Sequence, residues 1–261
     1  MMQDERFIRI IDFLKENQTG TLAELAGLNG VSLDTVRRDL EQLEKSKMLR
    51  RVRGGAVYHN ADITTHGVGV RSISHKKEKQ EIAELLSTRI VDGQAILLNS
   101  GTTCMEVAEL LSERFYRLTV MTNSLPVIRI LSRNQNFTII IPGGIVDGQE
   151  EAICGEQCET DIRKYNLDMA ILGVHAIDLE KGITDFRIHQ EPIMRAMLES
   201  SRKKVVVADH SKFGKVSYVN ICSLAEIDSI VTDSGLPEEI RRRYEDEGVD
   251  VVMPAADRRG N

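Results

Sequence analysis

The stretch that decides the fold runs from Val31 to Val57 and reads VSLDTVRRDLEQLEKSKMLRRVRGGAV. Its first half has four apolar residues at the spacing of one buried helix face: Leu33, Val36, Leu40 and Leu43. Ser32 can cap the first turn of this helix. The second half mixes apolar and basic residues around Gly54 and Gly55, which is typical of a β-hairpin. The stretch therefore predicts a helix followed by a small wing.

Two further helices are expected upstream. The first has apolar residues at positions i, i+3, i+4 and i+7, namely Phe7, Ile10, Ile11 and Leu14. Thr21 can cap a second, shorter helix, and Gly30 lies in the turn before Val31. Three small helices with a glycine-containing turn between the second and third indicate a helix-turn-helix. Together with the wing, they predict a winged helix-turn-helix domain over residues 1–58.

The polar side of the helix after Ser32 is expected to enter the major groove of double-stranded DNA, because such a helix reads base edges near its N-terminus. The candidates on it are Ser32, Asp34, Thr35, Arg37, Arg38 and Gln42. On the wing, Arg50, Arg51 and Arg53 are expected to contact phosphates, and Gly54 and Gly55 allow the backbone to approach them. The alternative for Arg37 and Arg38 is that they are solvated charges paired with Asp34 and Glu41.

The charge of the chain is unevenly distributed. The net charge is −6, but residues 1–60 hold 10 of the 34 basic and 9 of the 40 acidic residues. The remaining 201 residues therefore carry 24 basic against 31 acidic residues. Five basic residues with no acid among them follow the third helix: Lys45, Lys47, Arg50, Arg51 and Arg53. A short basic strip on an otherwise acidic protein indicates a local contact with a polyanion.

Beyond the wing the pattern changes. Residues 59–75 lose helical periodicity and are expected to form a linker, and residues 76–254 a second domain, followed by a tail at 255–261. In that domain helical segments alternate with seven apolar runs: AILL, LTVMT, FTIIIP, LDMAILGV, KVVVAD, IDSIVTD and VDVVM. Continuous apolar strands alternating with helices predict an α/β fold with a mostly parallel, Rossmann-like sheet covered on both faces.

The chain resembles the DeoR/GlpR family of bacterial transcription regulators. The resemblance begins in ELAGLNGVSLDTVRRDLEQLEKSKMLRRVRGGAV and continues through LLNSGTTCMEVAELL, TNSLPVIRIL, IIIPGG, ICGEQCETDI, LDMAILGVHAID and VVVADHSKFGKV, so it covers nearly the whole chain. It implies a repressor-type regulator of carbohydrate utilisation. Its C-terminal domain is then similar to sugar-phosphate isomerases and binds a phosphorylated sugar or a related metabolite as effector.

The residues themselves favour an anion at Ser100-Gly101-Thr102-Thr103. This segment follows an expected strand and opens an expected helix, where free backbone amides, hydroxyl groups and the positive helix end attract a phosphate. The alternative is a plain strand-to-helix turn with a threonine cap. Asn99 precedes the segment, at a position where many members of the resembled family have an aspartate. An amide in place of a carboxylate changes the hydrogen bonds that a sugar hydroxyl can form there.

Other effector-site candidates are polar or glycine residues that follow apolar runs, because open α/β sheets bind ligands at the carboxyl ends of their strands. They are Asn123, Ser124, Gly143, Gly144 and His175. Lys212 can neutralise a phosphate, and Asp178, Asp185 and Glu191 can accept sugar hydroxyls. Each carboxylate taken alone is more often a surface residue, and a lone histidine is usually just hydrogen-bonded.

Several classes of site and location are disfavoured. Cys104, Cys154, Cys158 and Cys222 form neither a disulfide framework nor a zinc-ligand pattern, and we expect no metal and no cofactor. The chain lacks the long apolar run of a membrane span and the start of a secretory signal. We therefore expect a cytoplasmic protein without a membrane partner.

Three functions compete. The first is an effector-controlled DNA-binding regulator acting as a dimer or tetramer, because a small helix-turn-helix needs two half-sites for adequate affinity. The second is a sugar-phosphate isomerase-like enzyme with a DNA-binding arm, using Asp185 or Glu191 as base. The third is a protein-interaction module, which leaves the basic wing unexplained. No nucleophile elbow of the GxSxG type is present, and we expect the first function and no catalysis.

Overall fold

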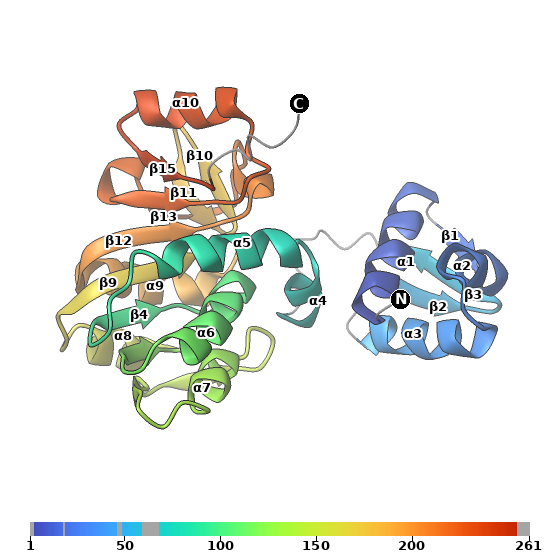
Figure 1. Ribbon diagram of the computed structural model, residues 1–261, viewed down its shortest axis with the longest axis horizontal. Helices are drawn as coiled ribbons and strands as arrows, with labels where there is room; N and C mark the ends of the chain where they lie inside the picture. Colours follow the sequence, from blue (N-terminus) through green and yellow to red (C-terminus); the bar gives the residue numbers. More distant parts are fainter. Residues whose placement is uncertain (1–2, 18, 46–48, 59–67, 255–261) are drawn as a thin grey trace. The chain divides into compact units, whose positions relative to one another are not determined.

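The computed structural model describes residues 3–17, 19–45, 49–58 and 68–254. The chain divides into two compact units, residues 1–74 and 75–261 (Figure 1). The first nine residues of the expected linker and the expected tail lie outside the described residues. Within the expected linker, Val68–Ile73 forms a short helix, α4. It was not predicted, because the linker sequence shows no helical periodicity.

The first unit contains a helix-turn-helix with a small sheet. Its elements are, in order, α1 (Gln3–Asn17), β1 (Thr19–Thr21), α2 (Leu22–Asn29), α3 (Leu33–Lys45), β2 (Leu49–Val52) and β3 (Gly55–Tyr58). β2 and β3 form the expected antiparallel hairpin. β1, which was not expected, pairs with the other edge of β3. This third strand attaches the wing to the segment between the first two helices.

The expected caps of this unit are present. The hydroxyl of Thr21 accepts a hydrogen bond from the backbone N–H of Glu24, and the carboxylate of Glu24 accepts one from the N–H of Thr21, so α2 begins with a capping box. Ser32 Oγ accepts from the N–H of Thr35 at the start of α3. The expected core is also formed, with one exception: Leu33 is 44% exposed. It is the first helical residue, and the buried side of α3 begins only at Val36.

The second unit is built on a seven-stranded parallel sheet, in agreement with the expected fold class. Its strand order is β15-β14-β12-β9-β4-β5-β6. The strands are β4 (Ala95–Leu98), β5 (Thr119–Thr122), β6 (Thr138–Ile140), β9 (Leu167–Gly173), β12 (Ser201–Val207), β14 (Ser229–Val231) and β15 (Asp250–Val252). Each coincides with one of the seven apolar runs, because a strand buried on both faces reads as a continuous apolar segment.

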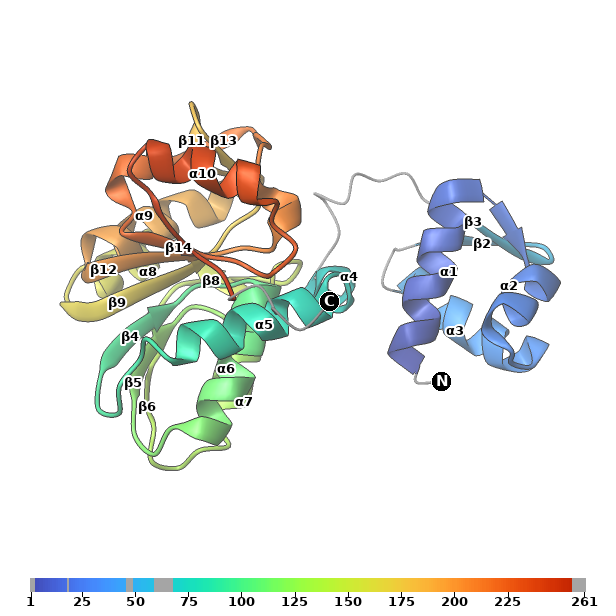
Figure 2. The same ribbon diagram turned by 45° about the horizontal axis from the view of Figure 1, so that its top comes forward.

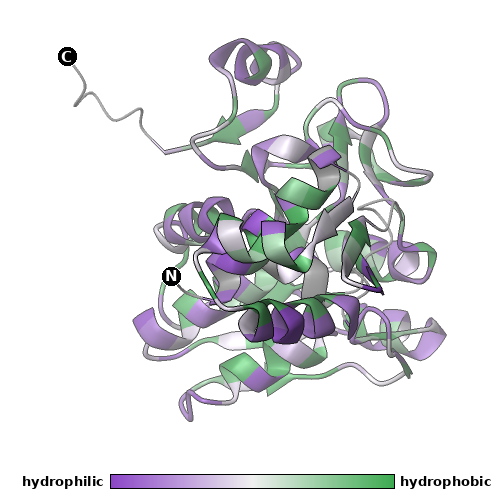
Figure 3. Ribbon diagram, turned by 90° about the vertical axis from the view of Figure 1, so that its right-hand side faces the viewer, coloured by the Kyte–Doolittle hydropathy of each residue, from purple (hydrophilic) through white to green (hydrophobic). Residues whose placement is uncertain are grey.

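Helices cover both faces of this sheet. They are α5 (Lys76–Ser87), α6 (Thr102–Arg114), α7 (Leu125–Leu131), α8 (Glu156–Ile162), α9 (Glu191–Glu199) and α10 (Glu238–Asp246). Figures 1 and 2 show α5 and α6 side by side. Alternate strand residues pack into two separate cores: Ile96 and Leu98 contact the α5–α7 side, while Leu97 faces the α8–α9 side. In Figure 3 the helices carry both green and purple segments, as helices with one buried side should.

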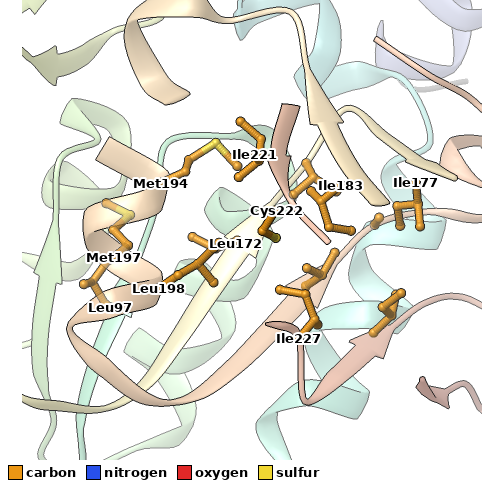
Figure 4. Close-up of a cluster of buried hydrophobic side chains, with 14 of the residues drawn as sticks. Leu97, Leu172, Ile177, Ile183, Met194, Met197, Leu198, Ile221, Cys222 and Ile227 are labelled. Carbon is orange, nitrogen blue, oxygen red and sulfur yellow. The ribbon is translucent and has the colours of Figure 1, made fainter. Parts of the chain in front are cut away.

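Short antiparallel elements, which the apolar runs did not predict, complete the unit. They are the hairpin of β7 (Ile145–Asp147) and β8 (Ala152–Cys154), and the sheet of β10 (Ala176–Asp178), β11 (Gly182–Asp185) and β13 (Val219–Cys222). Figure 4 shows Met194, Met197 and Leu198 of α9 packed in one cluster with Leu97 and Leu172 of the main sheet. The same cluster includes Ile177, Ile183 and Ile221 of the small sheet, so both sheets share a core.

Candidate functional site: a polar edge in the second unit and an exposed helix face in the first

The strand order places a switch point between β4 and β9. The chain leaves β4 toward β5 and β6 on one side, and then returns to add β9 on the other side of β4. Open α/β sheets bind ligands in the crevice outside the carboxyl ends of the strands at such a point. In this protein the segments at that place are Asn99–Thr103 after β4 and Gly173–His175 at the end of β9.

Asn99 holds the two strands together at the switch point. Its Nδ2 donates to the carbonyl of Gly173 at 2.9 Å, and its Oδ1 accepts from the N–H of Gly173 at 2.8 Å and from Cys104 Sγ at 3.1 Å. The side chain is 1% exposed. Both amide atoms of Asn99 are used within the fold, so its side chain has a structural role, and its contact with an effector stays a prediction.

A buried ion pair lies beside Asn99. Arg187 donates from Nε and Nη2 to the two carboxylate oxygens of Asp185, at 2.8 and 2.7 Å, and from Nη1 to the carbonyl of Ser100 at 2.6 Å. Burial by itself would raise the pKa of Asp185, but the guanidinium charge and hydrogen bonds of Arg187 hold that pKa below its usual range. Asp185, expected to accept a sugar hydroxyl, is therefore occupied in positioning Arg187, which in turn fixes the loop after β4.

The first turn of α6 faces this loop. Gly101 is the N-cap and provides no side-chain cap, so the first backbone N–H groups of the helix have no capping acceptor. The hydroxyls of Thr102 and Thr103 have no hydrogen bond to any residue that the structure describes. The start of α6 thus offers unpaired amides, two hydroxyl groups and the positive end of a 13-residue helix. This helix start has no threonine cap, because its N-cap residue is Gly101.

The loop after β5 contributes Asn123, which is fully buried. Its Nδ2 donates to the carbonyl of Ile153 and to Oε1 of Gln190, both at 2.8 Å. Gln190 Oε1 also accepts from Ser100 Oγ at 3.2 Å. The next residue, Ser124, caps α7 by accepting from the N–H of Val127. Asn123 and Ser100, both predicted, are thus joined through Gln190, which was not.

Other predicted residues have structural tasks. The N–H of Gly143 donates to Asp161 Oδ2 of α8 at 2.9 Å. A Cβ on Gly144 would lie 2.5 Å from the carbonyl oxygen of Cys154, so Gly144 allows the backbone to approach β8 closely. Asp178 Oδ1 accepts from the N–H groups of Glu180 and Lys181 and so forms the turn between β10 and β11. Each of these residues therefore has a structural explanation, and its assignment to the effector site stays a prediction.

His175 and Glu191 lie closer to the polar edge. The ring of His175 packs edge-to-face against Phe186, with centroids 5.0 Å apart, and its charge lowers the pKa of Asp185 as a minor contribution. Glu191 opens α9 directly after Gln190 and pairs with Arg195 at 2.8 Å. An acid in the first turn stabilises that helix, which explains Glu191 without a ligand.

A second polar cluster lies along the same edge, at the ends of β12 and β14. Asp233 accepts from the N–H of His210, and its Oδ2 lies 2.7 Å from His210 Nδ1. Burial by itself would raise the pKa of Asp209, but the charge of Lys212 and the hydrogen bond from Ser211 hold that pKa below its usual range. The two aspartates were missed, although each follows an apolar run, which is the signal that identified Ser100–Thr103.

This cluster reaches the start of α5. His75, the first residue of the second unit, packs edge-to-face on His210 with ring centroids 5.8 Å apart. The positive charges of His75 and Lys79 also help to lower the pKa of Asp209. In the first half of α5, Glu81 accepts hydrogen bonds from the N–H and the hydroxyl of Ser234. The loops after β12 and β14 are therefore attached to the first helix of the sensor.

In the first unit, the side of α3 opposite its core is exposed. Asp34, Arg37, Arg38 and Gln42 all lie on the exposed part of the helix. Arg37 Nη1 pairs with Asp34 at 2.6 Å, whereas Arg38 has no ion pair within the described ranges. Gln42 Oε1 accepts from Gln3 of α1 at 2.8 Å, so this side chain is oriented by α1. Arg38 is the best-placed arginine for a base contact.

The neighbouring Asp39 has a different task, which the spacing did not reveal. It is 1% exposed and accepts from Arg6 Nε at 2.7 Å and from Nη2 at 2.9 Å. This bidentate pair joins α1 to α3 and fixes the orientation of the exposed face.

The wing also has two sides. Arg50, Arg51, Arg53 and Gly54 are exposed, and Gly54 lies in the hairpin turn. Arg51 is oriented by Glu44 of α3, whose Oε1 accepts from the Arg51 N–H at 2.8 Å. Gly55 differs from the rest: it is buried, and a Cβ there would lie 2.1 Å from the carbonyl oxygen of Gly20. Close packing against β1 explains this glycine, and its DNA contact stays a prediction.

Comparison with known proteins decides the family. The model of the DeoR C terminal sensor domain matches residues 74–234, and that of the DeoR-like helix-turn-helix domain matches residues 6–62. This chain belongs to the DeoR family of transcription regulators. The family resemblance of the sequence is thereby confirmed over both units.

Curated relatives match along their whole length. The chain is 31% identical to the HTH-type transcriptional regulator GolR of Listeria innocua, covering 97% of this chain and 99% of that protein. It is 31% identical to the glycerol-3-phosphate regulon repressor of Escherichia coli, covering 97% and 100%. Among solved structures, ribose 5-phosphate isomerase A of Methanocaldococcus jannaschii is similar at 14% identity and a TM-score of 0.40, covering 54% of this chain and 55% of that one.

None of the helices in the described residues is long and apolar enough to cross a membrane. No group of three or more histidine, cysteine, aspartate or glutamate residues is arranged in the described ranges so that it can hold a metal ion.

Proposed function

We propose that this DeoR-family protein is a repressor of a carbohydrate-utilisation operon and that a phosphorylated sugar or related metabolite controls its affinity for operator DNA. The observation that carries this proposal is the start of α6: a 13-residue helix without a side-chain cap, opening at the switch point of a parallel sheet. Such a helix end stabilises a phosphate through its free amides and its dipole. Binding of phosphorylated and unphosphorylated sugars to the full chain tests it, and only the phosphorylated ones should bind.

An isomerase reading is less well supported by the geometry. A general base needs a pKa near neutrality and access to the substrate, whereas Asp185 is fully buried, bound by Arg187 and held at a lowered pKa. Glu191 is paired with Arg195 in its own helix. Burial also raises the pKa of the Cys104 thiol to about 12, so it is not a nucleophile at neutral pH. We therefore favour a sensor that does not consume its ligand.

The route from effector to DNA is proposed to run through α5. The loops after β12 and β14 lie at the same edge of the sheet as the start of α6, because all carboxyl ends of a parallel sheet share one edge. Those loops hold His75 and Glu81 at the start of α5. An effector that favours one arrangement of these loops would favour one arrangement of α5, and only such differential affinity can change DNA binding.

We further propose that the protein acts as a homo-oligomer, a dimer or tetramer. One small helix-turn-helix buries little surface on DNA. Two copies reading half-sites about one helical turn, ~34–36 Å, apart would supply the required affinity.

Replacing Arg38 with alanine should cost about 1–3 kcal/mol of discrimination between operator and unrelated DNA, because a bidentate arginine contact to a guanine would be lost. Arg38 is exposed on α3 and takes no part in the core of the first unit, so the fold should persist. Fluorescence anisotropy with operator and scrambled duplexes measures the difference.

Replacing Arg53 with alanine provides the matched control. Arg53 is exposed on the wing, and loss of a phosphate contact should weaken binding to both duplexes alike and reduce the slope of log affinity against log salt by about one. If Arg38→Ala also weakens both duplexes equally, α3 does not read bases as proposed.

A further inference from the structure

Gln190 lies where three segments of the polar edge meet. It ends the short 3-10 helix Ile188–Gln190 and immediately precedes α9. Its Oε1 accepts from Asn123 Nδ2 after β5 and from Ser100 Oγ after β4. Gln190 is 1% exposed and Asn123 is fully buried. The side-chain amide of Gln190 is therefore hydrogen-bonded to Ser100, the residue immediately before Gly101, which is the N-cap of α6.

Two polar atoms of this pair have no partner within the described ranges. They are Gln190 Nε2, a donor, and Asn123 Oδ1, an acceptor. Leaving a buried donor or acceptor unpaired costs about 1–3 kcal/mol, and most such groups in native proteins are satisfied. Two unpaired atoms on side chains that are hydrogen-bonded to each other therefore indicate a binding site for a polar group of a ligand.

The orientation of both amides follows from their neighbours. Asn123 has to present its Nδ2 to the carbonyl of Ile153, because a carbonyl only accepts. Gln190 then has to present its oxygen to that same Nδ2, since the reversed amide would oppose donor to donor. Gln190 Nε2 and Asn123 Oδ1 are consequently the atoms left over, and neither can exchange roles without breaking a bond.

A ligand group that pairs with both atoms has to accept from Gln190 Nε2 and donate to Asn123 Oδ1, and a hydroxyl group can do both, because it accepts through its oxygen and donates its proton. An anionic oxygen fits less well, because it would be repelled by Asn123 Oδ1. The start of α6 is suited to the anion instead. The two neighbouring features thus match two different parts of one molecule, a phosphate and a carbon-bound hydroxyl.

We propose that Gln190 and Asn123 together bind a hydroxyl group of the effector, adjacent to the phosphate at the start of α6, and so select hydroxylated phosphate esters over simple ones. This inference rests on the proposed phosphate site. It assigns specificity to Gln190, and it places the buried amide pair between the loops after β4 and β5 as the element that distinguishes effectors.

The experiment compares two classes of probe on the full chain by calorimetry. Methyl phosphate presents the anion without a carbon-bound hydroxyl. Glycerol 3-phosphate, ribose 5-phosphate, fructose 6-phosphate and glucose 6-phosphate present both groups. The wild type should bind the best of these esters at least about tenfold more tightly than methyl phosphate. In Gln190→Met, which has a side chain of similar size without a donor, the ratio of ester affinity to methyl phosphate affinity should fall about tenfold.

Two further variants make the result interpretable. Gln190→Asn keeps the amide chemistry but withdraws it from the site, and it should lose the preference as well; it also carries the comparison if the methionine variant does not fold. Gln80→Met changes an exposed glutamine of α5 and should leave both affinities as they are.

Each remaining outcome overturns a defined statement. If both Gln190 variants keep the full preference, or lose affinity for both probe classes equally, Gln190 does not read a hydroxyl. If the wild type binds methyl phosphate as tightly as every ester, the hydroxyl site is wrong and the phosphate site stands. If no phosphate compound binds, the proposed effector class fails, and the inference fails with it.

Discussion

Replacing Arg187 with methionine is expected to lower the free energy of unfolding by about 3–5 kcal/mol, because it leaves the buried Asp185 carboxylate without its counter-ion. The side chains of Arg187 and Asp185 are 4% and 0% exposed. The same change also removes one hydrogen bond each from the carbonyls of Ser100 and Gly173, so the loop that opens α6 should lose its fixed position. Denaturant unfolding of the full chain, followed by circular dichroism, measures the loss.

The matched control is Arg163→Met. Arg163 also pairs with two acids, Glu159 and Glu199, but its side chain is 43% exposed, and exposed pairs contribute about 0–1 kcal/mol. A loss of less than about 1 kcal/mol for Arg187→Met would show that the Asp185–Arg187 pair does not hold the polar edge together as described.

Replacing Asp39 with alanine should lower the stability of the helix-turn-helix unit by about 1.5–3 kcal/mol, the range for hydrogen bonds that involve charged groups. The change removes the two carboxylate oxygens that accept from Nε and Nη2 of the partly buried Arg6. A unit this small has a limited hydrophobic core, so a large share of its stability and its DNA binding should be lost together. Thermal unfolding followed in parallel with DNA binding measures both.

Glu41→Ala on the same helix is the control for that change. Glu41 is exposed, and its Oε1 forms a surface ion pair with Lys45 Nζ at 3.6 Å. Its removal should alter stability by less than about 1 kcal/mol. Equal effects of the two substitutions would mean that the Arg6–Asp39 pair is no more important than a surface pair.

The α/β architecture was predictable because its signals are local. The seven strands of a sheet that helices cover on both faces coincide with seven apolar runs, and Thr21 and Ser32 mark helix starts in the residues themselves. The short strands β7, β8, β10, β11 and β13 were not predicted, because they lie outside the seven apolar runs, in segments where charged, polar or glycine residues interrupt the apolar ones. Leu33 shows the limit of periodicity at a helix end, where the first turn can leave an apolar residue exposed.

The candidate site was predictable only in its outline. Polar residues after apolar runs located Ser100–Thr103 and Asn123 correctly at the carboxyl edge. The roles of Arg187 and Gln190 depend on contacts with residues 87 and 67 positions away, which no local pattern contains. Asp178 and Asp185 were assigned from charge alone. In the structure Asp178 accepts backbone hydrogen bonds in a turn, and Asp185 forms a buried ion pair with Arg187.

The most direct test of the central claim is the effect of phosphorylated sugars on DNA affinity. Duplexes selected from a random pool by the full protein would provide the operator, and its affinity would be measured with each phosphorylated sugar and with its unphosphorylated counterpart. We expect at least one phosphorylated sugar to change the affinity about 5–150-fold, the usual range of allosteric coupling, and its counterpart to leave it unchanged. Equal effects of both forms, or no effect of any phosphorylated sugar, would contradict the account.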